Sequence, residues 1–163
     1  MSELSSEFLK TTILFPVTES GVILGEKKQG FGAGWWNGFG GKLEAGETYE
    51  EAAIRETEEE SGLVVHSLVH AANVLFYFDY VPRVMSRAYI STDFSGVPIE
   101  TDEMRPQAFP LDQLPYDSMW PADRFWVPRV LSTDELLGFR VFFDKDKKFL
   151  QYGEIDPLLL SGL

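Results

Sequence analysis

A chain of 163 residues, of which 44% are hydrophobic and 14% aromatic, has the length and composition of one folded domain spanning residues 1–163. Its net charge of −12 argues against polymeric nucleic acid as a partner, because neutralising a phosphate backbone requires clustered Lys and Arg. The chain contains no cysteine, which excludes disulfide bonds, thiolate nucleophiles and thiolate metal ligands.

The first residues, MSELSSEFLKTTILFPV, begin with acidic side chains and contain only a short apolar run. This pattern is not that of a signal peptide. No stretch of the sequence approaches the ~18 consecutive apolar residues that suggest a membrane-spanning helix. We therefore expect a cytoplasmic protein that does not bind a membrane.

Two short strands are predicted at the start of the chain, over residues 8–17 and 22–24, with a turn at residues 19–21. A glycine-rich aromatic stretch follows at residues 29–41. It can be read as a pair of turns, since Asn37-Gly38 is a strong turn signal. It can equally be read as a loop whose bare backbone approaches a ligand, with contacts from Phe31, Trp35, Trp36 or Asn37.

A helix is predicted over residues 49–61. Thr48 and Glu51 form the pattern of a capping box, in which each side chain accepts a hydrogen bond from the other residue's amide. The segment after Thr48 holds good helix formers and no proline, and Gly62 suits the left-handed residue that commonly ends a helix.

Three glutamates of this helix, Glu56, Glu59 and Glu60, fall within an arc of roughly 120° at about 100° per residue. The same arc holds the small residues Ala52 and Ala53. A glutamate run is most simply a solvated helix face, but that interpretation places the acids opposite the small residues. Because neighbouring like charges oppose helix formation, their convergence on the packing side indicates a compensating hard cation, Mg²⁺ or Mn²⁺.

The remainder of the chain predicts more strands and a second helix. We expect long strands over residues 67–80 and 85–92, joined through Val81, Pro82 and Arg83, with Phe76 and Phe78 on one strand face. A short strand at 103–109, a helix from Pro121 to about Leu131, and a hairpin of residues 139–143 and 149–152 complete an α/β fold with mixed strands.

Residues 41–63 follow the pattern G-x5-E-x7-R-E-U-x-E-E-x-G-U, where U is a bulky aliphatic residue, and so resemble the Nudix box. The positions that match are Gly41, Glu47, Arg55, Glu56, Glu59, Glu60, Gly62 and Leu63. The one departure is Thr57, where an aliphatic is usual; it should affect packing under the helix more than chemistry. The resemblance implies an α/β/α sandwich with a mixed β-sheet between helices, and a Mg²⁺ cofactor, with Mn²⁺ as the alternative.

Further runs, KKQGFGAGWWNGFGGK, DEMRP and MWPADRFW, are similar to the oxidised-purine nucleoside triphosphate hydrolases, the eukaryotic-type relatives of MutT. Those enzymes hydrolyse 8-oxo-dGTP, 2-oxo-dATP and similar damaged nucleotides to the monophosphate and pyrophosphate, which keeps them out of DNA. The resemblance implies that Glu56, Glu59 and Glu60, with Arg55 to orient them, perform catalysis. The implied metal ligands are Glu56, Glu59, Glu60, Glu103 and the carbonyl of Gly40.

By the same matching, Asn37 and Asp123 would hydrogen-bond the purine and Trp120 would stack on it. The remaining implied substrate-binding residues are Thr12, Lys27, Phe31, Phe39, Gly41, Lys42, Phe76, Phe78, Met85 and Trp126. Where the family usually has two adjacent aspartates after MWP, this chain has Ala122 and Asp123. A pair of close acids can read different purine edges by changing which one is protonated, so we hypothesise a narrower or shifted base preference here.

The sequence leaves several alternatives open. A Nudix hydrolase of a nucleotide sugar, a dinucleoside polyphosphate or a methylated purine nucleotide would share the same box. A module that senses a nucleotide without cleaving it would be expected to lack box acids, and none is missing. The sequence does not choose between Glu56 and Glu60 as the general base, nor does it say which phosphorus is attacked. The resemblance makes a monomer the expected state.

Overall fold

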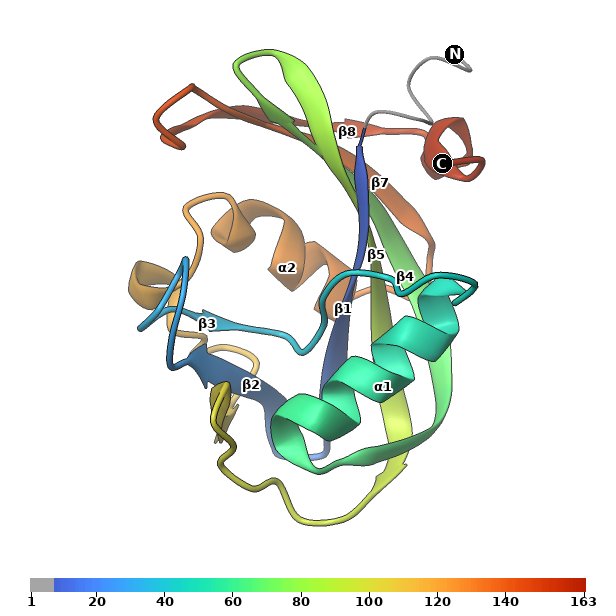
Figure 1. Cartoon of the computed structure of the whole chain (residues 1–163), viewed down its shortest axis with the longest axis vertical. Helices are drawn as coiled ribbons and strands as arrows, with labels where there is room; N and C mark the ends of the chain where they lie inside the picture. The colour runs from blue at the N-terminus through green and yellow to red at the C-terminus, as the bar shows by residue number, and fades with distance from the viewer. Residues whose placement is uncertain (1–7) are drawn as a thin grey trace.

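A mixed sheet forms the body of the protein in a computed structural model that describes residues 8–163 (Figure 1). The acidic N-terminal residues discussed above lie outside the described part. In spatial order the strands are β1 (Leu9–Thr18), β5 (Val81–Ser95), β4 (Val64–Phe78), β7 (Leu137–Phe143) and β8 (Phe149–Ile155). β1 runs parallel to β5 and β4 parallel to β7, whereas β4–β5 and β7–β8 are antiparallel. The predicted mixed sheet is therefore confirmed.

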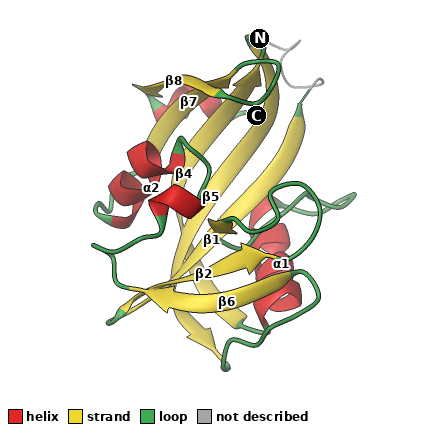
Figure 2. Ribbon diagram, turned by 90° about the vertical axis from the view of Figure 1, so that its left-hand side faces the viewer, coloured by secondary structure: helices red, strands yellow, loops and turns green. Residues whose placement is uncertain are grey.

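A smaller antiparallel group continues this sheet beyond β1 (Figure 2). It consists of β2 (Gly21–Lys27), flanked by the two-residue strand β3 (Trp36–Asn37) and by β6 (Met104–Phe109). β3 lies within the glycine-rich stretch, so that stretch is partly sheet rather than only turns. The tight turn between β1 and β2 leaves only Val17 and Thr18 paired across it, so the two groups of strands diverge.

Helices cover opposite faces of the large sheet, as consecutive residues of β1 demonstrate. Leu14 packs in a cluster with residues of α1 (Tyr49–Ser61), whereas Phe15 packs in a cluster with residues of α2 (Asp123–Leu131). Successive strand side chains point to opposite faces, so α1 and α2 lie on the two sides and the predicted α/β/α arrangement is confirmed. Two short 3-10 helices, η2 (Tyr116–Ser118) and η3 (Pro157–Leu160), complete the described elements. No helix within residues 8–163 is long and apolar enough to cross a membrane.

The connection between β4 and β5 differs from the expectation. The turn consists of Asp79 and Tyr80, with φ of 53° and 61°, whereas Val81 and Pro82 already belong to β5 and pair with Phe78 and Tyr77. A two-residue hairpin turn with both φ values positive matches the right-handed twist of its strands, which the predicted Val81–Arg83 connection would not. This turn fixes which residues of β5 face each side of the sheet.

The capping chemistry predicted for α1 is present at both ends. The Thr48 hydroxyl accepts from the Glu51 amide at 3.1 Å, and the Glu51 carboxylate accepts from the Thr48 amide at 3.4 Å. Gly62 ends the helix with φ of 78°, a conformation that favours glycine. Thr57 is fully buried under the helix and donates to the Ala53 carbonyl, so the departure from the Nudix pattern is accommodated in the packing.

We expect Thr48→Ala to lower the free energy of unfolding by about 1 kcal/mol, because the Glu51 amide loses its capping acceptor. The melting temperature should then fall by about 2–4 °C for a chain of this size. Urea and thermal unfolding, with Glu58→Gln on the exposed side of the same helix as the control, measure the change. A melting temperature equal to that of the control would contradict the role of the capping box.

Candidate functional site

Three carboxylates meet on the inward side of α1. Glu56 and Glu60 come from the helix and Glu103 from the turn before β6, and one oxygen of each lies within 4.8 Å of the others. Glu60 is only 6% exposed. For Glu56 and Glu60 the interpretation as a solvated helix face is therefore wrong. Glu103, one acid among many in the sequence, is brought to the helix by the fold.

Arg55 organises the acids around this cluster. Its guanidinium binds both oxygens of Glu47, at 2.7 and 2.9 Å, and reaches Glu56 Oε1 at 3.0 Å. Glu47 in turn accepts from the Glu44 amide, which closes the loop before the helix. The hydrogen bonds from Arg55 hold the pKa of the Glu47 carboxyl at about 2. These contacts agree with the predicted roles of Arg55 in orienting a helix carboxylate and of Glu47 in bracing the loop.

Glu59 is not brought into the cluster. Its side chain is 51% exposed and its carboxylate pairs with Arg55 at 3.2 Å. The structure therefore places two of the three predicted helix acids together, with Glu103 as the third member of the group. The predicted role of Glu59 as a metal ligand stays a prediction.

The electrostatics of the cluster favour a bound cation. The pKa of the Glu60 carboxyl is raised to about 8, mainly by burial; the amide of Gly40, at 2.8 Å, opposes the rise, and the charges of Glu56 and Glu103 add to it. Burial likewise raises the pKa of Glu56. Three converging carboxylates provide the oxygen ligands that a hard divalent ion requires, and its charge would let them ionise together.

Gly40, just before the box, and Gly41, its first residue, let the backbone pass close to these acids. The segment hydrogen-bonds along β1, through Phe39 and Leu14 and through Gly41 and Thr12. A Cβ on Gly40 would lie 1.8 Å from the Thr12 carbonyl oxygen, and one on Gly41 would lie 2.7 Å from Glu56 Oε1. Neither position can hold a side chain without displacing the backbone or the carboxylate. The predicted ligand atom, the carbonyl of Gly40, remains untested, since it is the amide of Gly40 that contacts Glu60.

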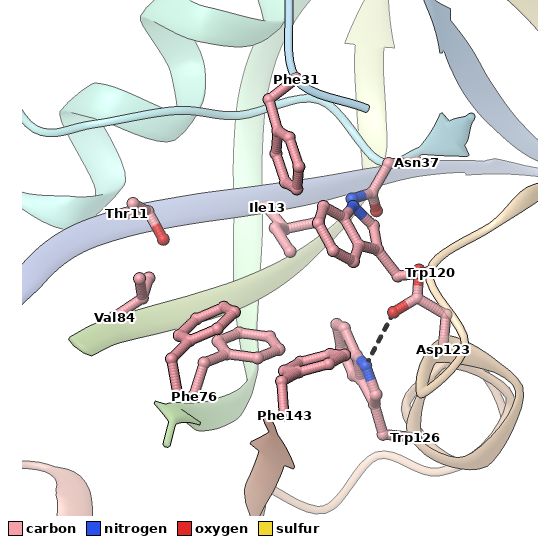
Figure 3. A pocket seen from close by; sticks show the side chains of 11 residues that line it. Thr11, Ile13, Phe31, Asn37, Phe76, Val84, Trp120, Asp123, Trp126 and Phe143 are labelled. Atoms are coloured by element: carbon pink, nitrogen blue, oxygen red, sulfur yellow. Dashed lines mark hydrogen bonds between the residues drawn. The ribbon is translucent and has the colours of Figure 1, made fainter. Parts of the chain in front are cut away.

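A largely apolar cavity of about 330 Å³ opens on the α2 side of the sheet. Its walls combine residues from β1, β4, β5, the glycine-rich stretch and α2, with aromatic rings on several sides (Figure 3). The lining residues are Thr11, Ile13, Phe31, Asn37, Phe76, Phe78, Val84, Trp120, Asp123, Trp126 and Phe143. The predicted substrate residues Phe31, Asn37, Phe76, Phe78, Trp120, Asp123 and Trp126 thus lie around one space.

A second cavity of about 210 Å³ adjoins the first and shares Ile13, Phe31, Asn37 and Trp120 with it. It leads to the acid cluster, because its other lining residues include Glu60 and four residues predicted to bind metal or substrate: Thr12, Lys27, Gly40 and Gly41. Two adjoining cavities therefore extend from the aromatic rings to Glu60 of the carboxylate cluster. Lys27 contributes a positive charge to the second cavity.

Two polar side chains in the aromatic cavity have atoms free for a ligand. Asp123 is 3% exposed, and its Oδ1 accepts from the Trp126 indole at 3.1 Å (Figure 3). Its Oδ2 has no hydrogen-bond partner within residues 8–163, and burial raises the pKa of this carboxyl to about 7. The Asn37 Oδ1 accepts from the Gly38 amide at 2.8 Å, which leaves Nδ2 of Asn37 as the group able to donate to a ligand.

Three residues predicted to bind substrate lie outside both cavities. Phe39 is fully buried in a core cluster with Ile23, Leu63 and Met104. Met85 packs on the opposite face of β5 with Leu75 and Leu160, and its neighbour Val84 lines the aromatic cavity instead. Lys42 is exposed, and its backbone carbonyl accepts a hydrogen bond from Arg55 at 3.2 Å.

Several lining residues were missed by the sequence reasoning. Thr11 and Ile13 flank Thr12 on β1 and therefore lie on the strand face opposite to it, so the prediction of Thr12 did not point to them. Val84 and Phe143 reach the cavity only because of the strand register and the hairpin of β7 and β8. No local signal in the sequence marks them.

Comparisons with known proteins agree with this arrangement. The NUDIX domain family model matches residues 8–130. The chain is 45% identical over 136 residues to the oxidized purine nucleoside triphosphate hydrolase of Mus musculus, covering 83% of this chain and 87% of that protein. The namesake protein of Danio rerio is 44% identical over the same fractions of the two chains.

Solved structures give the same result for the fold. The MutT protein of Bacillus halodurans superimposes with a TM-score of 0.80 at 26% identity, covering 90% of this chain and 97% of that one. A MutT NUDIX hydrolase from Burkholderia pseudomallei gives 0.60 at 28% identity, covering 68% and 88%. The family match spans most of the chain and includes the helix that bears Glu56 and Glu60. This protein belongs to the NUDIX family.

Proposed function

We propose that this protein hydrolyses oxidised purine nucleoside triphosphates, of the 8-oxo-dGTP and 2-oxo-dATP type, to the monophosphate and pyrophosphate. The observation that carries the proposal is a pair of adjoining cavities, one lined by aromatic rings and the other by Glu60 of the carboxylate cluster. A flat purine fits the first space and a triphosphate the second. The names of the mouse and zebrafish relatives support the same substrate class.

The base would lie among the aromatic rings, with Trp120 as the stacking surface. Nδ2 of Asn37 and Oδ2 of Asp123 would hydrogen-bond the purine edge, because both groups face the cavity with capacity to spare. Burying the base should make these two contacts selective, since an unpaired polar group in a buried site costs about 1–3 kcal/mol. Lys27 would meet the phosphates on their way to the acids.

Glu56, Glu60 and Glu103 would hold the divalent ion, and the resemblance to the oxidised-purine hydrolases adds Glu59 and the Gly40 carbonyl. Mg²⁺, or Mn²⁺ in its place, would supply charge neutralisation on the phosphate oxygens and a lower pKa for the attacking water. Arg55 holds Glu56 in place through its contact at 3.0 Å. Water would attack the α- or the β-phosphorus, and the P–O bond between these two phosphates would break. The leaving group would be pyrophosphate in the first case and the nucleoside monophosphate in the second, and Glu56 or Glu60 would accept the water proton.

The proposal extends to the setting of the enzyme. We expect a cytoplasmic monomer, folded as one domain over residues 1–163, whose partner is a small nucleotide rather than a nucleic acid polymer or a membrane. The acidic surface, with a net charge of −12, agrees with a substrate that arrives together with a cation.

A Mg²⁺-dependent pyrophosphate assay across dGTP, 8-oxo-dGTP, dATP, 2-oxo-dATP and O6-methyl-dGTP tests the proposed activity. We expect the highest kcat/KM for an oxidised purine. Preference for the methylated nucleotide would instead favour a different hydrolase of the same family. No pyrophosphate from any nucleotide, with binding retained, would favour a sensing module and contradict the enzyme proposal.

We expect Glu56→Gln to reduce kcat in that assay on the order of 100-fold or more, because it removes a charge from the cluster that stabilises the reacting phosphate. Glu58→Gln, on the exposed side of the same helix, is the matched control and should retain full activity. We expect Glu59→Gln to behave like Glu56→Gln, on the basis of the box match. Full activity in Glu59→Gln would remove Glu59 from the catalytic set, and full activity in Glu56→Gln would contradict the site itself.

Ala122 limits which purine bases the aromatic cavity can recognise. Its side chain is fully buried at the start of α2, directly before Asp123. The cavity therefore has one carboxyl, that of Asp123, instead of two. Its Oδ2 can accept a hydrogen bond when the carboxyl is ionised or donate one when it is protonated. It has no adjacent carboxyl that could hold the proton in its place. The free atom of Asn37 only donates. A purine edge that cannot bond both Oδ2 of Asp123 and Nδ2 of Asn37 leaves one of these buried groups without a hydrogen bond.

Wild-type protein should therefore separate 8-oxo-dGTP from 2-oxo-dATP by about tenfold or more in kcat/KM, as one lost hydrogen bond in a buried site predicts. Ala122→Asp should bring the two values within a few-fold of each other. Ala122→Asn, which adds similar volume without a titratable carboxyl, is the control. Comparable kcat/KM for both substrates in the wild type would contradict a narrowed base preference.

The burial of Glu60 also has a consequence for stability. Its pKa of about 8 in the folded, metal-free protein lies above the unfolded value, so the fold favours the protonated form. That contribution to stability is complete below about pH 4 and is lost as pH rises through about 8. A neutral side chain at this position would not lose it.

Metal-free Glu60→Gln should therefore exceed the wild type in unfolding free energy at pH 8.5, by on the order of 1–3 kcal/mol, and match it near pH 4.5. Adding Mg²⁺ should stabilise the wild type and leave Glu60→Gln nearly unchanged. Urea unfolding with a chelator or with Mg²⁺ measures both effects, with Glu58→Gln as the control. Parallel pH curves for the wild type and Glu60→Gln would contradict the raised pKa.

A further inference from the structure

Glu103 is the one member of the acid cluster that does not belong to α1. It lies on the exposed turn of residues 100–103, which connects the end of β5 to β6. The helix geometry fixes Glu56 and Glu60 relative to each other, one turn apart. The distance from Glu103 to them must be set by other contacts.

Thr101 makes those contacts. Its hydroxyl donates to the backbone carbonyl of Glu60 at 3.0 Å. The same oxygen accepts from the amides of Glu103 at 3.3 Å and Met104 at 3.2 Å. The Thr101 amide donates to the Met104 carbonyl at 2.9 Å, which closes the turn. One side chain thus joins the backbone of one cluster residue to the backbone of another.

Lys28 secures the same turn from its other side. Its Nζ donates to the Glu100 carboxylate at 2.6 Å and to the Thr101 carbonyl at 2.9 Å. Its backbone amide donates to the carbonyl of Glu103 at 2.9 Å. These bonds hold the turn against the start of the glycine-rich stretch. Two hydrogen bonds tie this part of the chain to the end of α1: the Ile99 amide, just before the turn, donates to the Ser61 carbonyl at 2.8 Å, and the Thr101 hydroxyl, within the turn, donates to the Glu60 carbonyl.

We propose that Thr101 is a positioning residue for metal binding, which holds the Glu103 carboxylate beside Glu56 and Glu60 by bonding the Glu60 carbonyl and the Glu103 amide with one hydroxyl. The inference rests on the proposed function, because it assigns a role to Thr101 only at a site that binds a divalent ion. Thr101 contributes no metal ligand and touches no reacting atom. Its effect passes through the position of Glu103.

Calorimetric titration with Mg²⁺ and with Mn²⁺, without nucleotide, tests the role of Thr101. Thr101→Val keeps the shape of the side chain and removes the hydroxyl. We expect it to weaken binding of both ions by about threefold to tenfold, below the ~10–100-fold typical of groups that bond a ligand side chain directly. Thr101→Ser retains the hydroxyl and should bind both ions as the wild type does.

Thr133→Val is the matched control. In the turn after α2, the Thr133 hydroxyl accepts from the Glu135 amide at 3.2 Å. This bond has the same spacing along the chain as the bond between Thr101 and Glu103. Thr133→Val should lower thermal stability less than Thr101→Val does, because one hydrogen bond is lost instead of three, and it should leave metal affinity unchanged. Loss of metal affinity in Thr133→Val would show that general destabilisation, rather than position, lowers the affinity, and would contradict the proposal.

Combining Thr101→Val with Glu103→Gln identifies the path of the effect. If Thr101 acts through Glu103, the double variant should bind Mg²⁺ no more weakly than Glu103→Gln alone. A further threefold to tenfold loss in the double variant would assign the effect to α1 instead and overturn the proposal. Wild-type affinity in Thr101→Val would overturn it too. A wild-type protein that binds neither ion would contradict the metal site as a whole, which the pyrophosphate assay tests separately.

Discussion

The burial of negative charge beneath α1 is the constraint on which the rest of this structure depends. Glu56 and Glu60 point inward and meet Glu103 within 4.8 Å, and Coulomb repulsion between such groups grows as water is excluded. The guanidinium of Arg55 cannot balance them, since it is engaged with both oxygens of Glu47 and with Glu59, and Glu56 is the one member of the cluster to which it donates. The cluster is therefore stable either partly protonated or with a bound cation, and the raised pKa of Glu60 expresses the first of these states.

The surrounding elements are consistent with a site built around that cation. Gly40 and Gly41 have no room for side chains, because β1 and Glu56 lie where a Cβ would be. Thr101 fastens the turn of Glu103 to the end of the helix. The aromatic cavity is assembled from the opposite face of the sheet and from α2, and it adjoins the second cavity, which Lys27 and Glu60 line. The metal-binding acids and the residues that recognise the purine can therefore vary independently. Ala122 is a change among the residues that recognise the purine.

What the sequence could predict was governed by how local each interaction is. The helix, its capping box and its terminal glycine depend on neighbours within a few residues, and all three are present. Glu103 could be proposed only by resemblance, because its approach to α1 is a long-range contact. Phe39 and Met85 were expected at the cavity and lie in the core. Phe39 is placed by a long-range bridge to Leu14, and the face that Met85 occupies is set by the register of β5. The register of β5 follows from the turn at Asp79 and Tyr80. The turn expected from the sequence lies two residues later, at Val81–Arg83.

The protonation state of Glu60 is the most direct measure of this account. Carbon-13 NMR of the Glu60 carboxyl, followed through pH in metal-free protein and again with saturating Mg²⁺, reports it without any assay of activity. The account predicts a midpoint near 8 in the metal-free protein and a midpoint far lower once the cation is bound. A midpoint near the ordinary glutamate value of about 4.3 in the metal-free protein, unchanged by Mg²⁺, would contradict it.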